Sequence, residues 1–164
     1  MKYRQVVVIG SGDEDKHAKE AYEIGEHIAK KGWVLISGGR GGVMEAASRG
    51  AGEAGGIVIG ILPDHSTSSA NKYCNIVIPT GMGYSRNLIN VLSGDAIVSI
   101  AGKSGTLSEL AYAWQFGKPV ILCRFTGGWS EKLSYSPVDD RMGANFYSAD
   151  SIEDVFKYLD NLLS

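Results

Sequence analysis

The chain has 164 residues, of which 44% are hydrophobic and 21% charged, as is usual for a globular protein, and we expect a single domain over 1–164. A net charge of −2 and a pI near 5.9 exclude a general basic surface for nucleic acid or an anionic membrane, so any anion has to be held by a local site. The first apolar run is too short for a signal peptide, and no stretch reaches the roughly 20 apolar residues of a transmembrane helix. We therefore expect a cytoplasmic protein with no nucleic-acid or membrane partner.

Apolar runs that suit buried strands alternate with segments of helical period along the chain. The expected strands are Val6–Ile9, Trp33–Ile36, Ile57–Leu62, Asn75–Pro79, Ala96–Ile100 and Pro119–Cys123. The expected helices are Lys16–Lys31, Val43–Ala54, Ser85–Leu92, Leu107–Phe116 and a last helix from Ser151. The alternation predicts right-handed βαβ units in an α/β, Rossmann-like doubly wound fold, with a mostly parallel sheet of six or seven strands flanked by helices. Residues 127–143 show no clear period and are interpreted as a surface excursion.

Two glycine-rich turns each follow an expected strand and precede an expected helix. One is Ser37–Met44, and the other is Gly102–Gly105, which encloses Lys103 and Ser104. Glycine lets the backbone approach a ligand closely, and a helix N-terminus offers free N–H groups and a partial positive charge. Ligands of doubly wound sheets bind at the carboxyl ends of the strands, where both turns fall. The sequence therefore predicts a site for a phosphate-like group.

A third turn, Gly10–Gly12, follows the first strand but lacks the last glycine of the dinucleotide fingerprint, because Asp15 stands there. We interpret this turn as the floor of the ligand site and not as an NAD motif. Cys74 and Cys123 are expected to be buried free thiols. No spacing of His, Cys or Asp predicts a metal site, and no serine triad can be proposed.

Four polar residues near these turns each have two interpretations. Glu109 either closes a capping box with Thr106 or contacts a ligand. Arg86 is either a solvated residue of the first helical turn or a grip for a phosphate or carboxylate. Lys103 and Arg40 are either exposed loop cations or additional charge for a bound phosphate.

Both glycine-rich motifs resemble those of the Lonely guy/lysine-decarboxylase-like family, nearest the branch of molybdenum-cofactor carrier proteins. Ser37–Met44 stands where the family has Gly-Gly-Gly-x-x-Gly-(Leu/Val)-Met, and Ala101–Glu109 stands where it has Pro-Gly-Gly-x-Gly-Thr-x-x-Glu. Arg86 lies fifteen residues before Ala101, at the spacing of the family arginine, and Thr80–Asn87 is similar to the carrier branch. The resemblance extends from Val6 to about Cys123.

The resemblance implies a cytosolic binding protein for a phosphorylated, nucleotide-like ligand, with a molybdenum-cofactor-type pterin phosphate as the leading candidate. The rival is a phosphoribohydrolase that cleaves AMP-like substrates, in which Arg86 and Glu109 are catalytic; a nucleotide sensor is a third alternative. No cofactor is required under the preferred interpretation, and the implied ligand is a molybdenum cofactor or an AMP-like nucleotide. The expected ligand-binding residues are Gly10, Ser11, Gly38, Gly39, Gly41, Gly42, Met44, Arg86, Asn87, Gly102, Lys103, Ser104, Gly105, Thr106 and Glu109.

The chain departs from the hydrolase pattern at Ser37, at Ala101 and Lys103, and at Asn87, where hydrolases usually have lysine. These departures leave phosphate binding intact and favour binding over hydrolysis. The resemblance also implies a homo-oligomer, a dimer or a tetramer. The helices expected at Ser85–Leu92 and Leu107–Phe116 carry more apolar side chains than one packed face needs, which agrees with an oligomer. Trp129 is interpreted as either a ligand lid or an oligomer contact.

Overall fold

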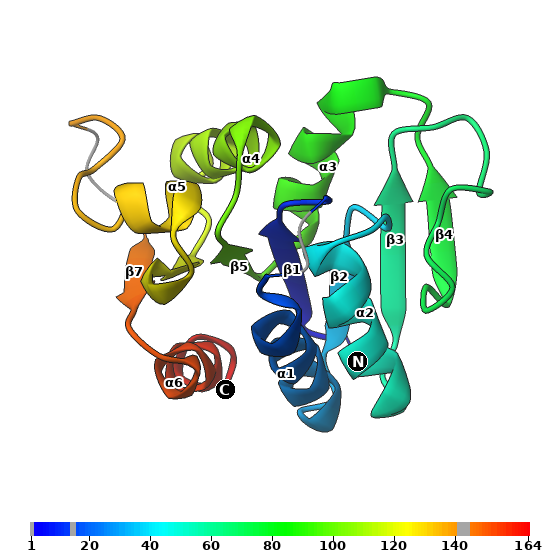
Figure 1. The fold of residues 1–164 in the computed structure, drawn as a ribbon, viewed down its shortest axis with the longest axis horizontal. Coiled ribbons are helices and arrows are strands. Elements are labelled where there is room, and N and C mark those ends of the chain that lie inside the picture. Colours follow the sequence, from blue (N-terminus) through cyan, green and yellow to red (C-terminus); the bar gives the residue numbers. More distant parts are fainter. Residues whose placement is uncertain (1, 14–15, 141–144) are drawn as a thin grey trace.

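Seven parallel strands form one sheet in the computed structural model, which describes residues 2–13, 16–140 and 145–164 (Figure 1). The strands are β1 (Gln5–Gly10), β2 (Val34–Ser37), β3 (Val58–Leu62), β4 (Ile76–Pro79), β5 (Ala96–Ile100), β6 (Val120–Cys123) and β7 (Phe146–Ala149). Their order across the sheet is β4-β3-β2-β1-β5-β6-β7. This arrangement confirms the predicted Rossmann-like α/β fold.

Helices cover both faces of the sheet. They are α1 (Ala18–Lys30), α2 (Val43–Glu53), α3 (Arg86–Ser93), α4 (Ser104–Gln115), α5 (Gly128–Lys132) and α6 (Ile152–Leu163), with short 3-10 turns at Gly83–Ser85 and Arg124–Thr126. Figure 1 shows α1, α2 and α6 on one side and α3, α4 and α5 on the other. Each layer has its own core, because β1 and β5 alternate their side chains between the two: Val6 and Val98 face the first layer, and Val7 and Ile97 face the second.

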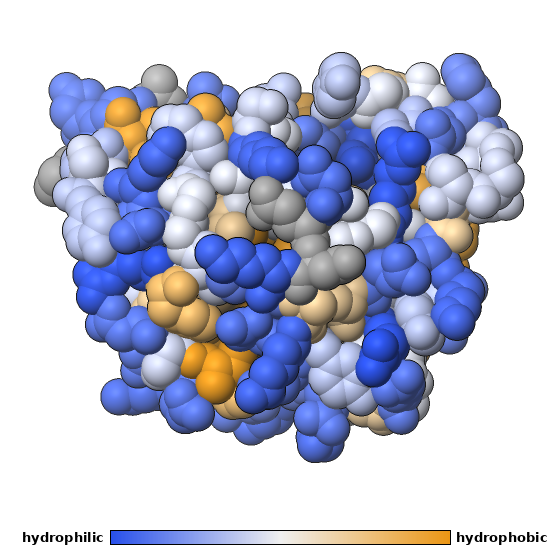
Figure 2. Space-filling view, in the orientation of Figure 1, coloured by the Kyte–Doolittle hydropathy of each residue, from blue (hydrophilic) through white to orange (hydrophobic). Residues whose placement is uncertain are grey.

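The central strands are buried on both faces, as their continuous apolar runs predict. β1 pairs in register with β2 and with β5, and all residues of β2, β5 and β6 are buried. Helices α1 and α2 pack so closely that a Cβ atom at Gly25 would lie only 2.0 Å from the Ala47 carbonyl oxygen, so glycine is needed there. On the outside of this layer, hydrophilic residues cover most of the surface and hydrophobic residues form small separate patches (Figure 2). The amphipathic helices predicted from the sequence account for this division.

The direction in which successive strands are added to the sheet reverses between β1 and β5, and this position is the switch point of the sheet. From β1 the chain proceeds outward through β2 and β3 to β4, and it then returns to the other side of β1 as β5. The loops after β1 and β5 therefore leave the sheet in opposite directions and open a crevice at the strands' carboxyl ends. This crevice is the expected position for a ligand in such a sheet.

Several elements differ from the sequence predictions. Helix α4 begins at Ser104, three residues before the expected start at Leu107. The expected surface excursion at 127–143 contains helix α5, and its residues 141–143 lie outside the described residues. Trp129 on α5 is partly buried and packs against the core of the second layer, and it does not line either cavity described below.

Three other local features can be compared with the predictions, and one of them, the burial of Cys74, differs. The Ser151 hydroxyl caps α6 by accepting a hydrogen bond from the Asp154 N–H at 3.2 Å. Both cysteines are free, but only Cys123 is fully buried, whereas Cys74 is partly exposed. Among the described residues, no helix is both long and apolar enough to cross a membrane.

Candidate functional site

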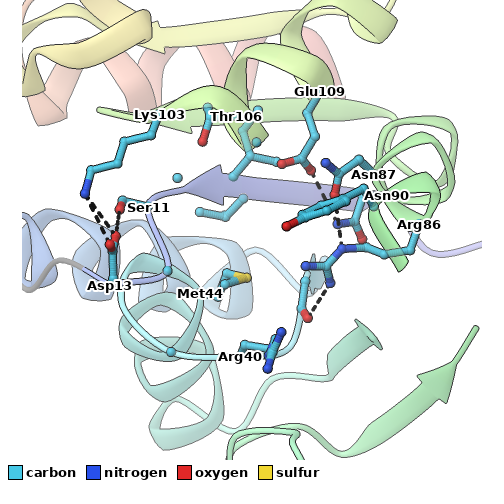
Figure 3. Close-up of a pocket in the computed structure, with 18 residues that line it drawn as sticks. Ser11, Asp13, Arg40, Met44, Arg86, Asn87, Asn90, Lys103, Thr106 and Glu109 are labelled. Atoms are coloured by element: carbon cyan, nitrogen blue, oxygen red, sulfur yellow. Dashed lines mark hydrogen bonds and ion pairs between the residues drawn. The ribbon is translucent and has the colours of Figure 1, made fainter. Parts of the chain in front are cut away.

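A cavity of about 620 Å³ opens at the carboxyl ends of β1, β2 and β5, in the crevice beside the switch point (Figure 3). It is lined by Val8, Ile9, Gly10, Ser11, Gly12, Asp13, Gly38, Arg40, Gly41, Met44, Tyr84, Arg86, Asn87, Asn90, Lys103, Gly105, Thr106 and Glu109. Both glycine-rich turns contribute to one wall or another of this cavity, as the sequence predicts. Its volume is within the usual range for a site that holds a small molecule.

The N-terminus of α4 forms one wall of the cavity. Lys103 occupies the N-cap position, and its own side chain makes no capping hydrogen bond. A Cβ atom built on Gly105 would have no other heavy atom within 4 Å, so the backbone at this position faces open space. The first N–H groups of a helix have no partner within the helix, and they carry its partial positive charge. This wall therefore presents backbone donors to the cavity without an intervening side chain.

The interpretation of Thr106 and Glu109 as a capping box is wrong. The box requires Thr106 to be the N-cap residue, but α4 begins at Ser104, so Thr106 lies inside the first turn. The Glu109 side chain instead lies at the cavity, and its Oε2 accepts a hydrogen bond of 3.4 Å from Asn90 Nδ2 on α3. Glu109 therefore lines the cavity and does not cap the helix.

The turn before α4 is held from behind by α5 and the residue run that leads to it. Ala101 adopts a φ of +49°, a conformation that a residue with a side chain rarely takes. Its N–H donates to the Thr126 hydroxyl at 2.7 Å, and its carbonyl accepts from the Ser130 hydroxyl at 2.8 Å. The Gly102 carbonyl accepts from the Trp129 N–H at 3.2 Å. These contacts fix the turn from which α4 begins.

Arg86 holds the opposite wall together. Its Nη1 donates to the Gly38 carbonyl at 2.7 Å and to the Ile61 carbonyl at 2.5 Å, and its Nε donates to Asn87 Oδ1 at 3.1 Å. The guanidinium thereby ties the glycine-rich turn after β2 to the end of β3. Burial lowers the pKa of Arg86, and the attraction of Glu109 partly opposes that effect. Arg86 remains a cation at the cavity, but much of its hydrogen-bonding capacity is used within the protein.

Glu109 and Asn90 form the deep, polar end of the cavity. Glu109 is 8% exposed, and burial raises the pKa of its carboxyl from the usual 4.5 to about 7, against the opposing effects of Arg86 and Asn90. Asn90 Oδ1 is the one buried side-chain nitrogen or oxygen of the described residues that has no hydrogen-bond partner. A desolvated carboxyl beside an unsatisfied amide is typical of a functional site.

Lys103 and Asp13 form an ion pair at the other end of the cavity (Figure 3). Lys103 Nζ lies 3.2 Å from Asp13 Oδ2, and the Ser11 hydroxyl donates to the same carboxylate. The hydrogen bond from Ser11, together with Lys103, lowers the pKa of Asp13. The pair connects the loop after β1 to the loop after β5. Lys103 brings positive charge to this end of the cavity, and the Asp13 carboxylate partly neutralises it.

Most of the residues predicted from the sequence to bind a ligand line this cavity. The predicted residues that do so are Gly10, Ser11, Gly38, Gly41, Met44, Arg86, Asn87, Lys103, Gly105, Thr106 and Glu109. Gly39, Gly42, Gly102 and Ser104 do not line it. Gly42, for example, has a φ of +61° and lies against the Ser11 carbonyl, where a Cβ atom would be 2.4 Å away, so it shapes the turn behind the wall.

Gly12 also lines the cavity, as expected for the Gly10–Gly12 turn, but the sequence predictions missed three polar residues of the wall. They are Asp13, Tyr84 and Asn90. Asn90 was within reach of sequence reasoning, since it lies one helical turn after Arg86 and residues four apart share a helix face. Tyr84 belongs to the irregular segment before α3, which has no periodic pattern to place it.

Fold and site together define a Rossmann-like α/β protein with a polar cavity at the switch point of its sheet. A family model matches residues 3–156, and the chain belongs to the SLOG cluster4 family. It is similar to the molybdenum cofactor binding protein of the phototrophic bacterium Rippkaea orientalis, at 37% identity and a TM-score of 0.89, over 100% of this chain and 99% of that one. The resemblance to the carrier branch of the Lonely guy-like proteins is therefore confirmed.

Two further proteins are similar to this chain. The molybdenum cofactor carrier protein of Chlamydomonas reinhardtii is 36% identical, with a TM-score of 0.84 and 98% of each chain covered. A cytokinin riboside 5'-monophosphate phosphoribohydrolase of Mycobacterium tuberculosis is 32% identical over 111 residues, which are 62% of this chain and 59% of the enzyme. The chain is thus similar to carrier proteins over nearly its whole length and to a hydrolase over part of it.

Proposed function

We propose that the chain is a binding protein for a phosphorylated, nucleotide-like heterocycle, with a molybdenum-cofactor-type pterin phosphate as its leading cargo. The observation that carries this proposal is the uncapped N-terminus of α4, where Gly105 leaves the backbone open to a cavity of about 620 Å³. The likeness over the full chain to the cofactor-binding protein of Rippkaea orientalis supports the choice of cargo.

The phosphate of the ligand would lie against the amides of Gly105 and Thr106. A charge-assisted hydrogen bond contributes about 1.5–3 kcal/mol, and the helix dipole adds about 0.3–1 kcal/mol for an anion at its N-terminus. Lys103 adds charge at the same end, although its pairing with Asp13 reduces what it offers. The heterocycle would extend along the cavity toward Asn90 and Glu109.

The state of the two candidate catalytic residues supports binding over hydrolysis. Arg86 donates to the Gly38 and Ile61 carbonyls, so its guanidinium stabilises the wall and is less available to polarise a substrate. Burial raises the pKa of Glu109 to about 7, so near neutral pH some of the molecules hold this carboxyl in its neutral form. A neutral carboxyl is a poor stabiliser of positive charge at a ribose carbon, but it is a good hydrogen-bond partner for a heterocycle.

A phosphoribohydrolase acting on AMP-like nucleotides is the alternative, and one observation favours it. Glu109 lies in the same cavity as the α4 amides, so a bound nucleoside monophosphate would have a carboxyl within the site that holds its phosphate. The similarity to the Mycobacterium tuberculosis enzyme points in the same direction. Both functions use the same cavity, and they differ in whether the N-glycosidic bond is broken.

Native mass spectrometry and thermal-shift screening against AMP, other nucleotides and pterin phosphates test the proposal. A ligand that binds only the folded protein stabilises it by about 2.7 kcal/mol at one hundred times its Kd, which is easily measured. We expect a phosphorylated heterocycle to bind and its dephosphorylated form to bind far more weakly. Equal binding of the two forms would contradict the proposed role of the α4 N-terminus.

We also propose that the chain forms a homo-oligomer. Large apolar side chains remain exposed on α3, at the end of α4 and on the edge strand β4. The sequence led us to expect exposed apolar side chains on the two helices but not on β4. The exposed side chains include Leu92 at 46%, Phe116 at 54%, Ile76 at 48% and Ile78 at 44% exposure. An edge strand with exposed isoleucines is a surface that monomeric proteins usually avoid.

A further inference from the structure

A second, smaller cavity of about 220 Å³ adjoins the first. It is lined by Arg40, Pro63, Gly83, Tyr84 and Arg86. Arg40, Tyr84 and Arg86 border both cavities, so the two are neighbours that share a wall. Figure 3 shows Arg40 and Arg86 at one end of the main cavity and Lys103 with Asp13 at the other. The second cavity therefore adjoins the end that lies away from Lys103.

Two guanidinium groups meet at this shared wall with unused hydrogen-bond donors. Arg40 is exposed, and within the part of the chain that the structure describes its side chain has no hydrogen-bond or ion-pair partner. Arg86 uses Nη1 and Nε for its bonds within the protein, and its Nη2 has no partner among the same described residues. Each planar guanidinium thus keeps donors in a geometry that suits the oxygens of an anion.

The two arginines are close enough to repel each other. Burial is the main cause that lowers the pKa of Arg86, and the positive charge of Arg40 lowers it further, while Glu109 and Asp64 oppose both effects. Asp64 already accepts a hydrogen bond from the Ser69 hydroxyl, and neither Asp64 nor Glu109 lines the second cavity. An anion between the two arginines would relieve the repulsion that the protein leaves in place.

Tyr84 completes the wall with an aromatic side chain that the protein does not bury. Its exposure is 94%, although tyrosine is a residue whose ring is usually at least partly covered. The preceding Gly83 has a φ of +57° and open space at its Cβ position, and Tyr84 lines both cavities. The ring offers a face on which a planar heterocycle can stack, and the guanidinium groups of Arg40 and Arg86 supply the positive charge for an anion.

We propose that the second cavity is an anion subsite, and that the natural ligand carries a second negatively charged oxygen-bearing group that lies between Arg40 and Arg86. The ligand class is then a heterocycle with two separated anionic ends, one at the α4 N-terminus and one at the arginines. The role of the first end rests on the proposed function, whereas the second stands on residues of its own. A plain nucleoside monophosphate would fill only the first subsite.

Tungstate, a tetrahedral oxyanion similar in shape to phosphate, tests this subsite. We expect isothermal titration to give two tungstate ions per chain, and anomalous scattering from soaked crystals to place one at the Gly105 and Thr106 amides and the other between the two arginines. The Arg40→Gln variant should lose only the second ion. Gly105→Val should lose only the first ion, because its side chain would occupy the approach to the amides.

Arg49→Gln is the matched control, since Arg49 lies on α2, pairs with Glu53 at 3.3 Å and lines neither cavity. It should keep both ions. A wild-type protein that binds tungstate at the α4 N-terminus alone would overturn the subsite, as would a second ion that persists in Arg40→Gln. A wild type that binds tungstate between the two arginines but not at the α4 N-terminus would instead contradict the proposed function and leave the subsite standing.

Discussion

Gly105 offers the sharpest perturbation of the proposed phosphate site, because a side chain there meets the ligand and not the protein. A Cβ atom at Gly105 has no atom of another segment within 4 Å, so the methyl group of alanine fits there without moving a neighbour. The residue lies in α4, and glycine is less favourable in a helix than alanine or valine. We expect Gly105→Ala and Gly105→Val to fold normally, with stability unchanged or raised by several tenths of a kcal/mol.

The loss of affinity follows from the hydrogen bonds that the new side chain would block. A phosphate at the Gly105 and Thr106 amides makes two charge-assisted bonds of about 1.5–3 kcal/mol each, so losing both costs about 3–6 kcal/mol. Since about 1.4 kcal/mol corresponds to a tenfold change, Gly105→Val should weaken binding at least about a hundredfold. The single methyl group of Gly105→Ala should have a smaller effect in the same direction.

Isothermal titration of a phosphorylated ligand against each variant measures this effect, with urea unfolding as the check on stability. Gly52→Ala is the matched control: it also lies in a helix, its Cβ atom would make an ordinary 3.9 Å contact with Tyr73, and it lines neither cavity. Unchanged affinity in Gly105→Val would place the phosphate elsewhere and refute the reasoning.

Three further predictions concern charge and assembly. The pKa of Glu109 in the folded protein, about 7, lies above the usual 4.5, so the folded protein binds more protons than the unfolded chain between these pH values. The free energy of unfolding should therefore fall by on the order of 3 kcal/mol as the pH rises from 4.5 to 8. Urea titrations of Glu109→Gln should lack this loss. Arg86→Ala should lower the free energy of unfolding by about 2–4 kcal/mol, because the Gly38 and Ile61 carbonyls lose a charged donor, and a change below about 0.5 kcal/mol would contradict that role. Sedimentation should show an oligomer at micromolar concentration that Leu92→Glu weakens; a stable wild-type monomer would count against the exposed apolar surface as an interface.

The convergence of the glycine-rich turns on one cavity was predictable from the sequence. Alternating strands and helices predict a parallel sheet, and a parallel sheet places every turn after a strand at the same edge. That reasoning brings Gly38 and Gly105 together although 67 positions separate them in the chain. The same rule explains why Gly10 and Ser11 lie in the wall between them.

The roles of individual side chains were harder to predict, because they depend on contacts between distant segments. The start of α4 at Ser104 removes the capping box, and no local pattern distinguishes that start from one at Leu107. Arg86 reaches the carbonyls of residues 48 and 25 positions away, which no spacing in the sequence reveals. The support that Ser130 gives to the Ala101 turn likewise comes from a segment without helical period.

The central claim is that this cavity binds a phosphorylated heterocycle without cleaving it. Incubation of the wild type with AMP, followed by chromatographic detection of adenine and ribose 5-phosphate, tests that claim most directly when native mass spectrometry records binding in the same samples. The account predicts a bound phosphorylated ligand and no release of base. Adenine released by the wild type, and lost in Glu109→Ala, would contradict it and identify the chain as a phosphoribohydrolase.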